Sequence, residues 1–229
     1  MKTLGLIGGM SWESTQLYYR LINEGVRREL GGLHSAELIL HSVDFAAIEQ
    51  MQVNGQWPRA GAQLAGIGRR LEMAGADALV LCTNTMHKVA AQIEQATSVP
   101  FLHIADVTRR AIEAEGYRRV ALLGTRFTME EAFLIDRLQS DELTVVVPEQ
   151  PERDFIDGII FDELCRGVTR EASRAGYQRI IERLVGDGVE AVVLGCTEIG
   201  LLVDGASLPV PVFDTTRLHA EAAVAFALA

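Results

Sequence analysis

The two halves of the 229-residue chain are weakly similar in sequence, and this internal repeat limits the fold more than any other feature. Three pairs of segments recur in the same order: LGLIGGMSWEST (4–15) with VALLGTRFTMEE (120–131), GADALVLCTNTMH (75–87) with GVEAVVLGCTEIG (188–200), and SVPFLHIADVTRR (98–110) with PVPVFDTTRLHA (209–220). The offset is 116 residues between Gly8 and Gly124 but 114 between Cys82 and Cys196, a drift that loop insertions produce in a duplicated unit. The repeat therefore predicts two similar structural units.

Short apolar runs alternate with longer helical patterns along the whole chain. The runs rich in leucine and β-branched residues predict strands at 3–8, 36–43, 76–82, 99–104, 119–124, 143–148, 189–195 and 210–214. The intervening patterns predict amphipathic helices at 11–30, 59–75, 87–96, 106–116, 127–139, 169–188 and 217–229. Nearly all-apolar strands that alternate with helices are typical of parallel sheets covered on both faces. We therefore predict an α/β protein of two similar lobes, each a mostly parallel sheet flanked by helices, related by a pseudo-twofold duplication.

The predicted lobes divide the chain near its middle. Residues 1–105 form the first α/β lobe and 106–214 the second, and the closing helix 215–229 is expected to pack back on the first. Each lobe is long enough to bury a core of its own. The aromatic residues Trp12, Tyr18 and Tyr19 are expected to pack one helix face against a sheet.

Composition narrows the range of partners. The net charge of −10 disfavours a nucleic-acid ligand, because binding to phosphates needs a basic surface. No apolar run reaches the 18 or so residues that span a bilayer, and the N-terminus lacks a signal-peptide pattern. We therefore expect a cytoplasmic protein with no membrane partner. The three cysteines should stay thiols in that compartment, and their spacing predicts no zinc site.

Two of the three cysteines occupy matching places in the repeat. Cys82 and Cys196 each end an apolar run and are followed by a threonine and a predicted helix start. The electropositive field of a helix amino terminus favours a thiolate and should lower the pKa of both thiols. An isolated cysteine is more often a small buried hydrophobe. That structural interpretation suits Cys165, which has no partner in the repeat.

Two matched thiols suggest a narrow kind of chemistry. If both flank one substrate carbon, a thiolate on one face removes a proton while a thiol on the other face supplies one. The stereocentre then inverts, and the two groups exchange roles in the reverse direction. Such a pair predicts racemase or epimerase activity.

The chain resembles the aspartate/glutamate racemase family, which works without pyridoxal phosphate. GLIGGMSWEST near the start, LCTNTMH around Cys82, LLGTRFTM in the middle and LGCTEIGLL around Cys196 carry this resemblance. It implies two α/β lobes with the active site between them, one acid/base cysteine from each lobe, no metal or organic cofactor, an amino-acid substrate and commonly a homodimer. It also implies a substrate pocket lined by Met10, Ser11, Thr83, Asn84, Thr85, Thr125, Thr197 and Glu198.

The chain departs from the family at two positions that matter for specificity. Aspartate-specific members carry an arginine in a Pro-Asp-Arg segment after the second strand and a lysine in the second lobe, and both grip the substrate's side-chain carboxylate. Here residues 41–51 read HSVDFAAIEQM, and FDELCRG places Cys165 at the lysine position with Arg166 next to it. Either Arg166 or another group replaces those contacts, or the enzyme accepts neutral side chains.

Other interpretations stay open beside the racemase. GLIGGM is not a GxGxxG dinucleotide-binding motif, and no acidic residue follows at the spacing of a ribose ligand. A decarboxylase or a cis/trans isomerase of small dicarboxylates would need one thiol, and a non-catalytic amino-acid sensor would need none. His87 is expected to pack in a helix or support the site. His103 and Asp214 either orient a catalytic group or cap a helix.

Overall fold

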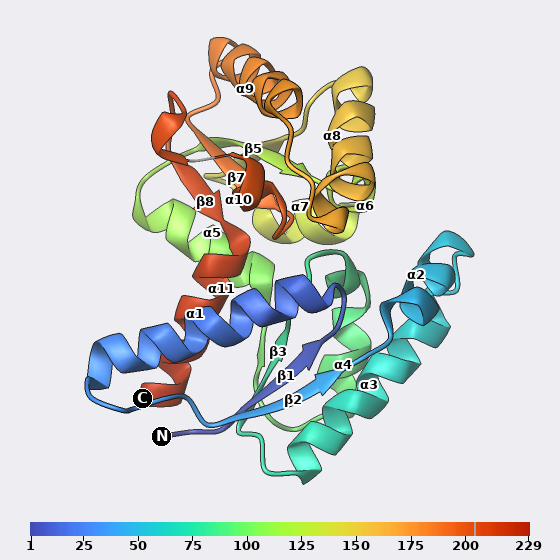
Figure 1. Ribbon diagram of the computed structural model, residues 1–229, viewed down its shortest axis with the longest axis vertical. Helices are drawn as coiled ribbons and strands as arrows, with labels where there is room; N and C mark the ends of the chain where they lie inside the picture. Colours follow the sequence, from blue (N-terminus) through green and yellow to red (C-terminus); the bar gives the residue numbers. More distant parts are fainter. Residues whose placement is uncertain (204) are drawn as a thin grey trace. The chain divides into compact units, whose positions relative to one another are not determined.

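The chain folds as two α/β units, each built on a four-stranded parallel sheet (Figure 1). The computed structural model describes residues 1–203 and 205–229. Unit 1 comprises residues 1–104 and 219–229, and unit 2 comprises residues 105–218. The predicted fold class of two similar parallel sheets flanked by helices is confirmed. In the described part of the chain, no helix is both long and apolar enough to span a membrane.

Unit 1 has the strand order β2-β1-β3-β4. Its elements are β1 (Leu4–Gly8), α1 (Trp12–Leu30), β2 (Leu38–Ser42), α2 (Phe45–Val53), α3 (Trp57–Met73), β3 (Ala78–Leu81), the 3₁₀ helix η1 (Thr85–Val89), α4 (Ala90–Ala96), β4 (Phe101–Leu102) and most of α11 (Thr215–Leu228).

The central strands of unit 1 are apolar throughout because helices cover both faces of the sheet. Leu4 and Leu6 of β1 point to one face, where they pack with α1 and α11. Ile7 points to the other face and packs with α2, α3 and α4. This alternation follows from the two-residue period of a strand, and burial on both sides removes the polar positions that a one-sided sheet would show.

Unit 2 repeats this arrangement with the strand order β6-β5-β7-β8. Its elements are α5 (Ile104–Ala114), β5 (Arg119–Gly124), α6 (Arg126–Glu130), α7 (Ala132–Leu138), β6 (Thr144–Val146), α8 (Gln150–Asp162), the 3₁₀ helix η2 (Leu164–Arg166), α9 (Glu171–Gly186), β7 (Ala191–Gly195), α10 (Ile199–Leu202), the 3₁₀ helix η3 (Gly205–Ser207) and β8 (Val212–Asp214). One face of its sheet packs against α8 and α9. All eight predicted strands are present, and the second half of the chain reproduces the order of the first.

The helices differ from the predicted pattern in four places. The structure adds α2, α8 and α10, and it divides the predicted helix 127–139 into α6 and α7 at Glu131, whose backbone is extended. The start of α8 is stabilised by a capping box in which the Glu149 N–H donates to Glu152 over 3.1 Å. A glutamate pair at this spacing beside Pro151 is a helix-start signal that was present in the sequence.

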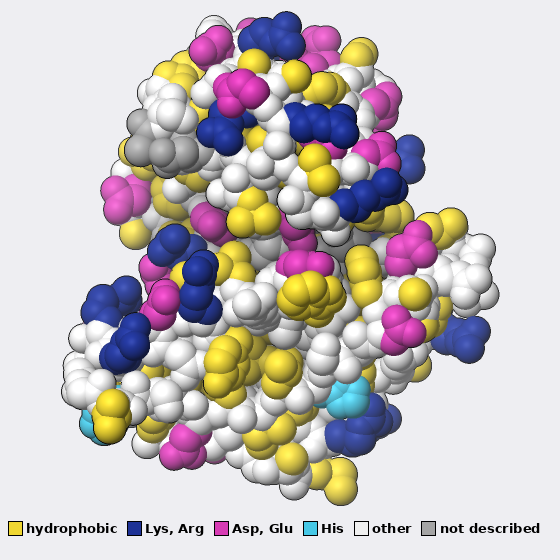
Figure 2. Space-filling view, viewed as in Figure 1, with side chains coloured by type: hydrophobic (Ala, Val, Ile, Leu, Met, Phe, Trp, Pro, Cys, Tyr) yellow, Lys and Arg dark blue, Asp and Glu magenta, His cyan; other side chains and the backbone are white. Residues whose placement is uncertain are grey.

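The expectation that Trp12, Tyr18 and Tyr19 share one buried face is wrong. Tyr18 is fully buried, but Trp12 is 64% exposed and Tyr19 is 55% exposed. Trp12 and Tyr19 are seven residues apart and therefore share the outer side of α1, whereas Tyr18 lies about 100° away from Tyr19 around the helix. The space-filling view accordingly shows hydrophobic side chains on the face of unit 1 that α1 crosses (Figure 2).

Glycine ends the central strand of each sheet because the following helix approaches very closely. A Cβ atom on Gly8 would lie 2.4 Å from Cγ2 of Thr15, and one on Gly124 would lie 2.3 Å from Oγ1 of Thr128. The Thr15 hydroxyl also accepts from the Gly9 N–H over 2.8 Å. Both repeats therefore need glycine at this point to bring a helix start against the strand end.

Substitution of Gly8 by alanine should destabilise unit 1. The added methyl group overlaps Thr15, so we expect the free energy of unfolding to fall by about 1–3 kcal/mol. Both tryptophans, Trp12 and Trp57, lie in unit 1, so tryptophan fluorescence during urea unfolding measures that unit. Gly66→Ala is the matched control: it lies in the open interior of α3, and alanine there should raise stability by about 0.5–1 kcal/mol. Equal effects of the two substitutions would contradict the close-approach argument.

Candidate active site

The two matched cysteines follow equivalent strands at the carboxyl edges of the two sheets. Cys82 comes directly after β3, which pairs with β1, and its N–H donates to the Ile7 carbonyl over 2.9 Å. Cys196 comes directly after β7, which pairs with β5. Ligands of open parallel sheets bind at this edge, where side chains after neighbouring strands converge.

In unit 1, the segment after β1 lies beside the segment after β3. Ser11 caps α1 by accepting from the Ser14 N–H over 3.2 Å, and the Ser14 hydroxyl donates to the Cys82 carbonyl over 3.3 Å. The amino terminus of α1 is therefore hydrogen-bonded to the loop of Cys82, Thr83 and Asn84, called the cysteine loop below. Met10, Thr83 and Asn84 are also buried at this edge, and Thr85 is partly exposed at the start of η1. The unit 1 residues predicted to line a pocket thus belong to one local region.

Burial dominates the chemistry of Cys82. Its side chain is completely buried and makes a weak sulfur contact with the Val80 carbonyl at 3.8 Å. Removal from water raises the pKa of the Cys82 thiol, because the charged form loses its hydration. The expected lowering of this pKa by a helix amino terminus is therefore wrong for Cys82 as the structure has it. The element that follows Cys82 is also a short 3₁₀ helix, which has a smaller dipole field than a long α-helix.

In unit 2, the predicted site residues include a compact hydrogen-bonded group. The Cys196 thiol donates to Oε2 of Glu198 over 3.0 Å, and the Thr197 hydroxyl donates to the same oxygen over 2.7 Å. Glu198 is buried, whereas Cys196 and Thr197 are partly exposed. The family resemblance implies that Glu198 lines the substrate pocket, and its contact with the thiol adds a role that the sequence did not indicate.

Four effects raise the pKa of the Cys196 thiol, and burial is the largest. The Glu198 charge comes next, and the hydrogen bond from the thiol to that carboxylate adds to it. The neighbouring Cys165 raises the pKa of Cys196 further. As with Cys82, the expected lowering is wrong, because burial and the carboxylate beside the thiol both disfavour the charged form.

Thr125 follows β5 at the start of α6, the place that corresponds to the segment after β1. Its hydroxyl lies 3.4 Å from that of Thr128, whose hydroxyl also donates to the Thr125 carbonyl over 2.8 Å. The strand pairing sets Gly124 beside Gly195, so Thr125 and Cys196 leave the sheet at the same edge. The structure therefore groups Thr125 with the unit 2 cysteine.

Arg166, the residue considered as a replacement grip for an acidic side chain, has another role. Arg166 is 69% exposed and lies 3.6 Å from Asp162 in an ion pair on the surface. Cys165 instead packs against the same apolar cluster as Cys196. The side chain that η2 contributes near the Cys196 thiol is therefore neutral.

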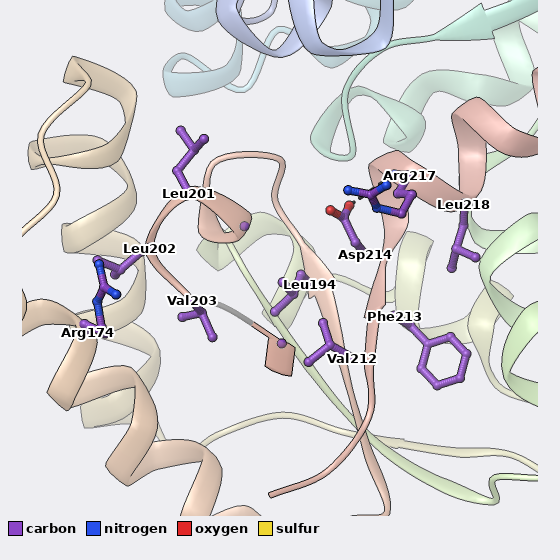
Figure 3. Close-up of a pocket in the computed structure, with 12 residues that line it drawn as sticks. Arg174, Leu194, Leu201, Leu202, Val203, Val212, Phe213, Asp214, Arg217 and Leu218 are labelled. Atoms are coloured by element: carbon purple, nitrogen blue, oxygen red, sulfur yellow. Dashed lines mark hydrogen bonds between the residues drawn. The ribbon is translucent and has the colours of Figure 1, made fainter. Parts of the chain in front are cut away.

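Asp214 is a helix cap. Its carboxylate accepts from the N–H groups of Thr216 and Arg217 over 2.9 and 3.2 Å at the start of α11, and burial raises its pKa. It also lines a cavity of about 570 Å³ in unit 2, walled by Leu201, Val203, Val212 and Phe213, with Arg174 across from it (Figure 3). Neither Cys196 nor Thr197 lines this cavity.

His87 is a buried supporting residue of the cysteine loop, as expected. Nδ1 lies 2.7 Å from the Thr83 carbonyl, and Nε2 accepts from the Ile104 N–H over 3.2 Å. His103 is buried against it, with ring centroids 4.5 Å apart. Among the residues that the structure describes, no group of three or more His, Cys, Asp or Glu side chains could hold a metal ion.

The fold and the site define a class: duplicated parallel α/β proteins with a cysteine at the carboxyl edge of each sheet. A profile of Asp/Glu/Hydantoin racemases matches residues 7–223, so the chain belongs to that family and the resemblance is confirmed. Racemases are isomerases.

The relatives agree in sequence and fold. A broad-specificity amino-acid racemase of Bacillus subtilis is 24% identical over 164 residues, which cover 70% of this chain and 69% of the relative. A Yersinia pestis protein provisionally described as an Asp/Glu racemase is 51% identical with a TM-score of 0.95, and 100% of both chains is covered. An aspartate racemase homologue from Pyrococcus horikoshii is 34% identical with a TM-score of 0.86, again over 100% of both chains.

Replacement of Glu198 by glutamine should make Cys196 more reactive toward alkylation at neutral pH. The carboxylate raises the pKa of Cys196 by its charge and by accepting the thiol hydrogen bond, so its loss lowers that pKa. We expect the midpoint of the pH profile for iodoacetamide labelling of Cys196 to move to lower pH, as measured by peptide mass spectrometry.

Glu163→Gln is the matched control for this measurement. Glu163 is also a buried carboxylate of unit 2, but it accepts from Ser173 and Arg170 and is not among the groups that shift the pKa of Cys196. Its loss should leave the Cys196 profile in place. The same midpoint in Glu198→Gln and the unsubstituted protein would show that the carboxylate does not hold the thiol proton.

Proposed function

We propose that the protein is an amino-acid racemase that inverts the α-carbon by proton transfer between Cys82 and Cys196. The observation that carries this proposal is the equivalent placement of the two thiols: each directly follows a central strand, at the ligand-binding edge of its sheet, in a member of a racemase family. One thiolate removes the α-proton from one face of the substrate, and the opposing thiol protonates the other face. The two groups exchange roles for the opposite enantiomer.

The polar residues around the cysteines would stabilise the carbanion that forms. An α-proton is weakly acidic, so donors must be aimed at the substrate carboxylate, where negative charge develops. Ser11, Thr83 and Asn84 of unit 1 and Thr125 and Thr197 of unit 2 supply hydroxyl and amide groups for this purpose. They stand at the strand ends, so the rigid sheets orient them.

Glu198 gives Cys196 a route to act as a base. The Cys196 thiol donates to the carboxylate at rest, so transfer of this proton yields a thiolate and a neutral carboxylic acid. The pair carries one negative charge before and after the transfer, so no additional buried charge is created. That matters because desolvation otherwise makes the thiolate costly at this position. The incoming substrate ammonium would offset the charge on either thiolate.

A neutral substrate side chain fits the surroundings of Cys196 better than an acidic one. Cys165 stands near the thiol where acidic-specific relatives have lysine, and Arg166 is engaged at the surface by Asp162. Residues 42–51 contain no basic side chain. A carboxylate brought into this region would lose water without gaining a cation. Broad specificity also agrees with the similarity to the Bacillus subtilis relative.

The main competing function is single-thiol chemistry, such as decarboxylation or cis/trans isomerisation of small dicarboxylates. The two cysteines have different surroundings: Cys82 is completely buried, while Cys196 is partly exposed and paired with a carboxylate. This difference makes single-thiol chemistry the second candidate. That chemistry would need Cys196 alone.

Substitution of either cysteine by serine should remove racemisation. A serine hydroxyl is a much weaker acid and base than a thiol, so we expect the rate to fall by at least ~100-fold in Cys82→Ser and in Cys196→Ser. Chiral chromatography measures inversion, and incubation in heavy water measures exchange of the α-hydrogen. Cys165→Ser is the control and should stay active. Carbon dioxide release or isomerisation that survives in Cys82→Ser would establish the single-thiol alternative instead.

The protein should prefer neutral amino acids over acidic ones as substrates. We expect kcat/KM for homoserine, methionine or leucine to exceed that for aspartate and glutamate by at least ~10-fold, because a buried carboxylate without a partner is unfavourable. Cys165→Lys should raise activity toward aspartate, whereas Cys165→Ser should not. A high rate with aspartate in the unsubstituted protein would overturn the assignment of side-chain preference while leaving the two-cysteine mechanism in place.

A further inference from the structure

Unit 1 buries three histidines in one group beside the cysteine loop. His87 lies at the centre, with its ring centroid 4.5 Å from that of His103 and 5.8 Å from that of His219. All three side chains are buried. The sequence indicates no catalytic use for this group, since the second repeat has Leu201 where the first has His87.

The hydrogen bonds of His87 define its protonation state. The Ile104 backbone N–H can only donate, so Nε2 of His87 must be the acceptor of that 3.2 Å bond. Nδ1 then carries the hydrogen of the neutral ring and donates to the Thr83 carbonyl over 2.7 Å. A protonated ring would present two donors and lose the Ile104 contact, so the structure requires a neutral ring with the hydrogen on Nδ1.

These bonds join the loop that follows Cys82 to a second strand end. Thr83 is the residue next to the cysteine, and Ile104 comes two residues after β4. The His87 N–H also donates to the Asn84 carbonyl over 3.0 Å. The side chain and the backbone of one residue therefore hold two consecutive carbonyls of the cysteine loop.

We propose that His87 is a positioning residue that holds the loop of Cys82, Thr83 and Asn84 in the geometry needed for proton transfer. This inference rests on the proposed role of Cys82 as one of the two acid/base groups. A buried thiol makes few directional contacts of its own, so its orientation depends on the backbone that carries it. A displacement of about 1 Å at a reacting group reduces a rate by about 100-fold.

Two substitutions separate the two hydrogen bonds. In His87→Asn the amide nitrogen can occupy the place of Nδ1 and donate to Thr83, whereas the longer side chain of His87→Gln reaches toward the Ile104 side. If the Thr83 contact positions the loop, His87→Asn should keep more activity than His87→Gln. We expect kcat to fall by about 100-fold in His87→Gln.

The diagnostic measurement is α-hydrogen exchange in heavy water, compared with inversion, for each enantiomer. With Cys82 misplaced, Cys196 still removes the proton of one enantiomer and returns a deuteron to the same face. His87→Gln should therefore raise the ratio of exchange to inversion for that enantiomer only. A general structural defect would lower exchange and inversion together. His34→Gln, at an exposed histidine of the same unit, should change nothing.

Labelling by iodoacetamide tests the loop without relying on turnover. In His87→Gln, Cys82 should be alkylated several-fold faster than in the unsubstituted protein, while the Cys196 rate stays unchanged. Leu71→Ala removes an apolar core side chain of unit 1 that takes no part in these hydrogen bonds, and it serves as the control for destabilisation. The proposal is overturned if His87→Gln leaves Cys82 labelling unchanged, or accelerates it no more than Leu71→Ala does for the same loss of unit 1 stability. Failure of the unsubstituted protein to racemise any amino acid would refute the proposed function, and the labelling would still decide whether His87 holds the loop.

Discussion

Parallel pairing of the two central strands in each sheet determines where the chemically useful residues lie. β1 pairs with β3, and β5 pairs with β7, so the chain leaves each sheet twice at one edge. A glycine ends β1 and another ends β5, which lets the next helix begin against the strand. The cysteine after the neighbouring strand then meets that helix start, as the Ser14 contact with the Cys82 carbonyl shows. The duplication preserves this arrangement even though the loops around it differ in length.

The low polarity of these strand ends governs the acid/base chemistry. A thiol is tolerated there at little cost, but a thiolate is not, and burial raises the pKa of both cysteines. Two-base racemisation needs each sulfur to be charged for part of the cycle. A site of this kind must therefore offset the cost of the buried thiolate charge when the reaction occurs. A proton acceptor such as Glu198 or the positive charge of the substrate can do this. A permanently charged thiolate would oppose folding of the same edge.

The strands and the family were predictable from the sequence, whereas the electrostatics of the site were not. Apolar runs such as that of β7 have a strong local signal because both faces of the strand are buried. The pKa direction of Cys82 depends on how deeply neighbouring helices cover it, which no local pattern encodes. The same holds for Glu198, since a residue two positions after Cys196 can face substrate or thiol depending on its rotamer. The helix break at Glu131 likewise has no neighbouring glycine or proline from which it could be predicted.

The two repeats have kept the same cysteine but surrounded it differently. Two residues after the cysteine, the first copy has Asn84 and the second has Glu198; five residues after it, the first has His87 and the second has Leu201. In the second copy a carboxylate holds the thiol directly, whereas in the first a neutral imidazole holds the backbone beside the thiol. A racemase must bring both enantiomers to one carbanion, but its two bases need not be identical. In the proposed mechanism each base must be matched to the charge and burial of its own unit, so divergence around a retained thiol is what separate optimisation of the two cysteine surroundings would produce.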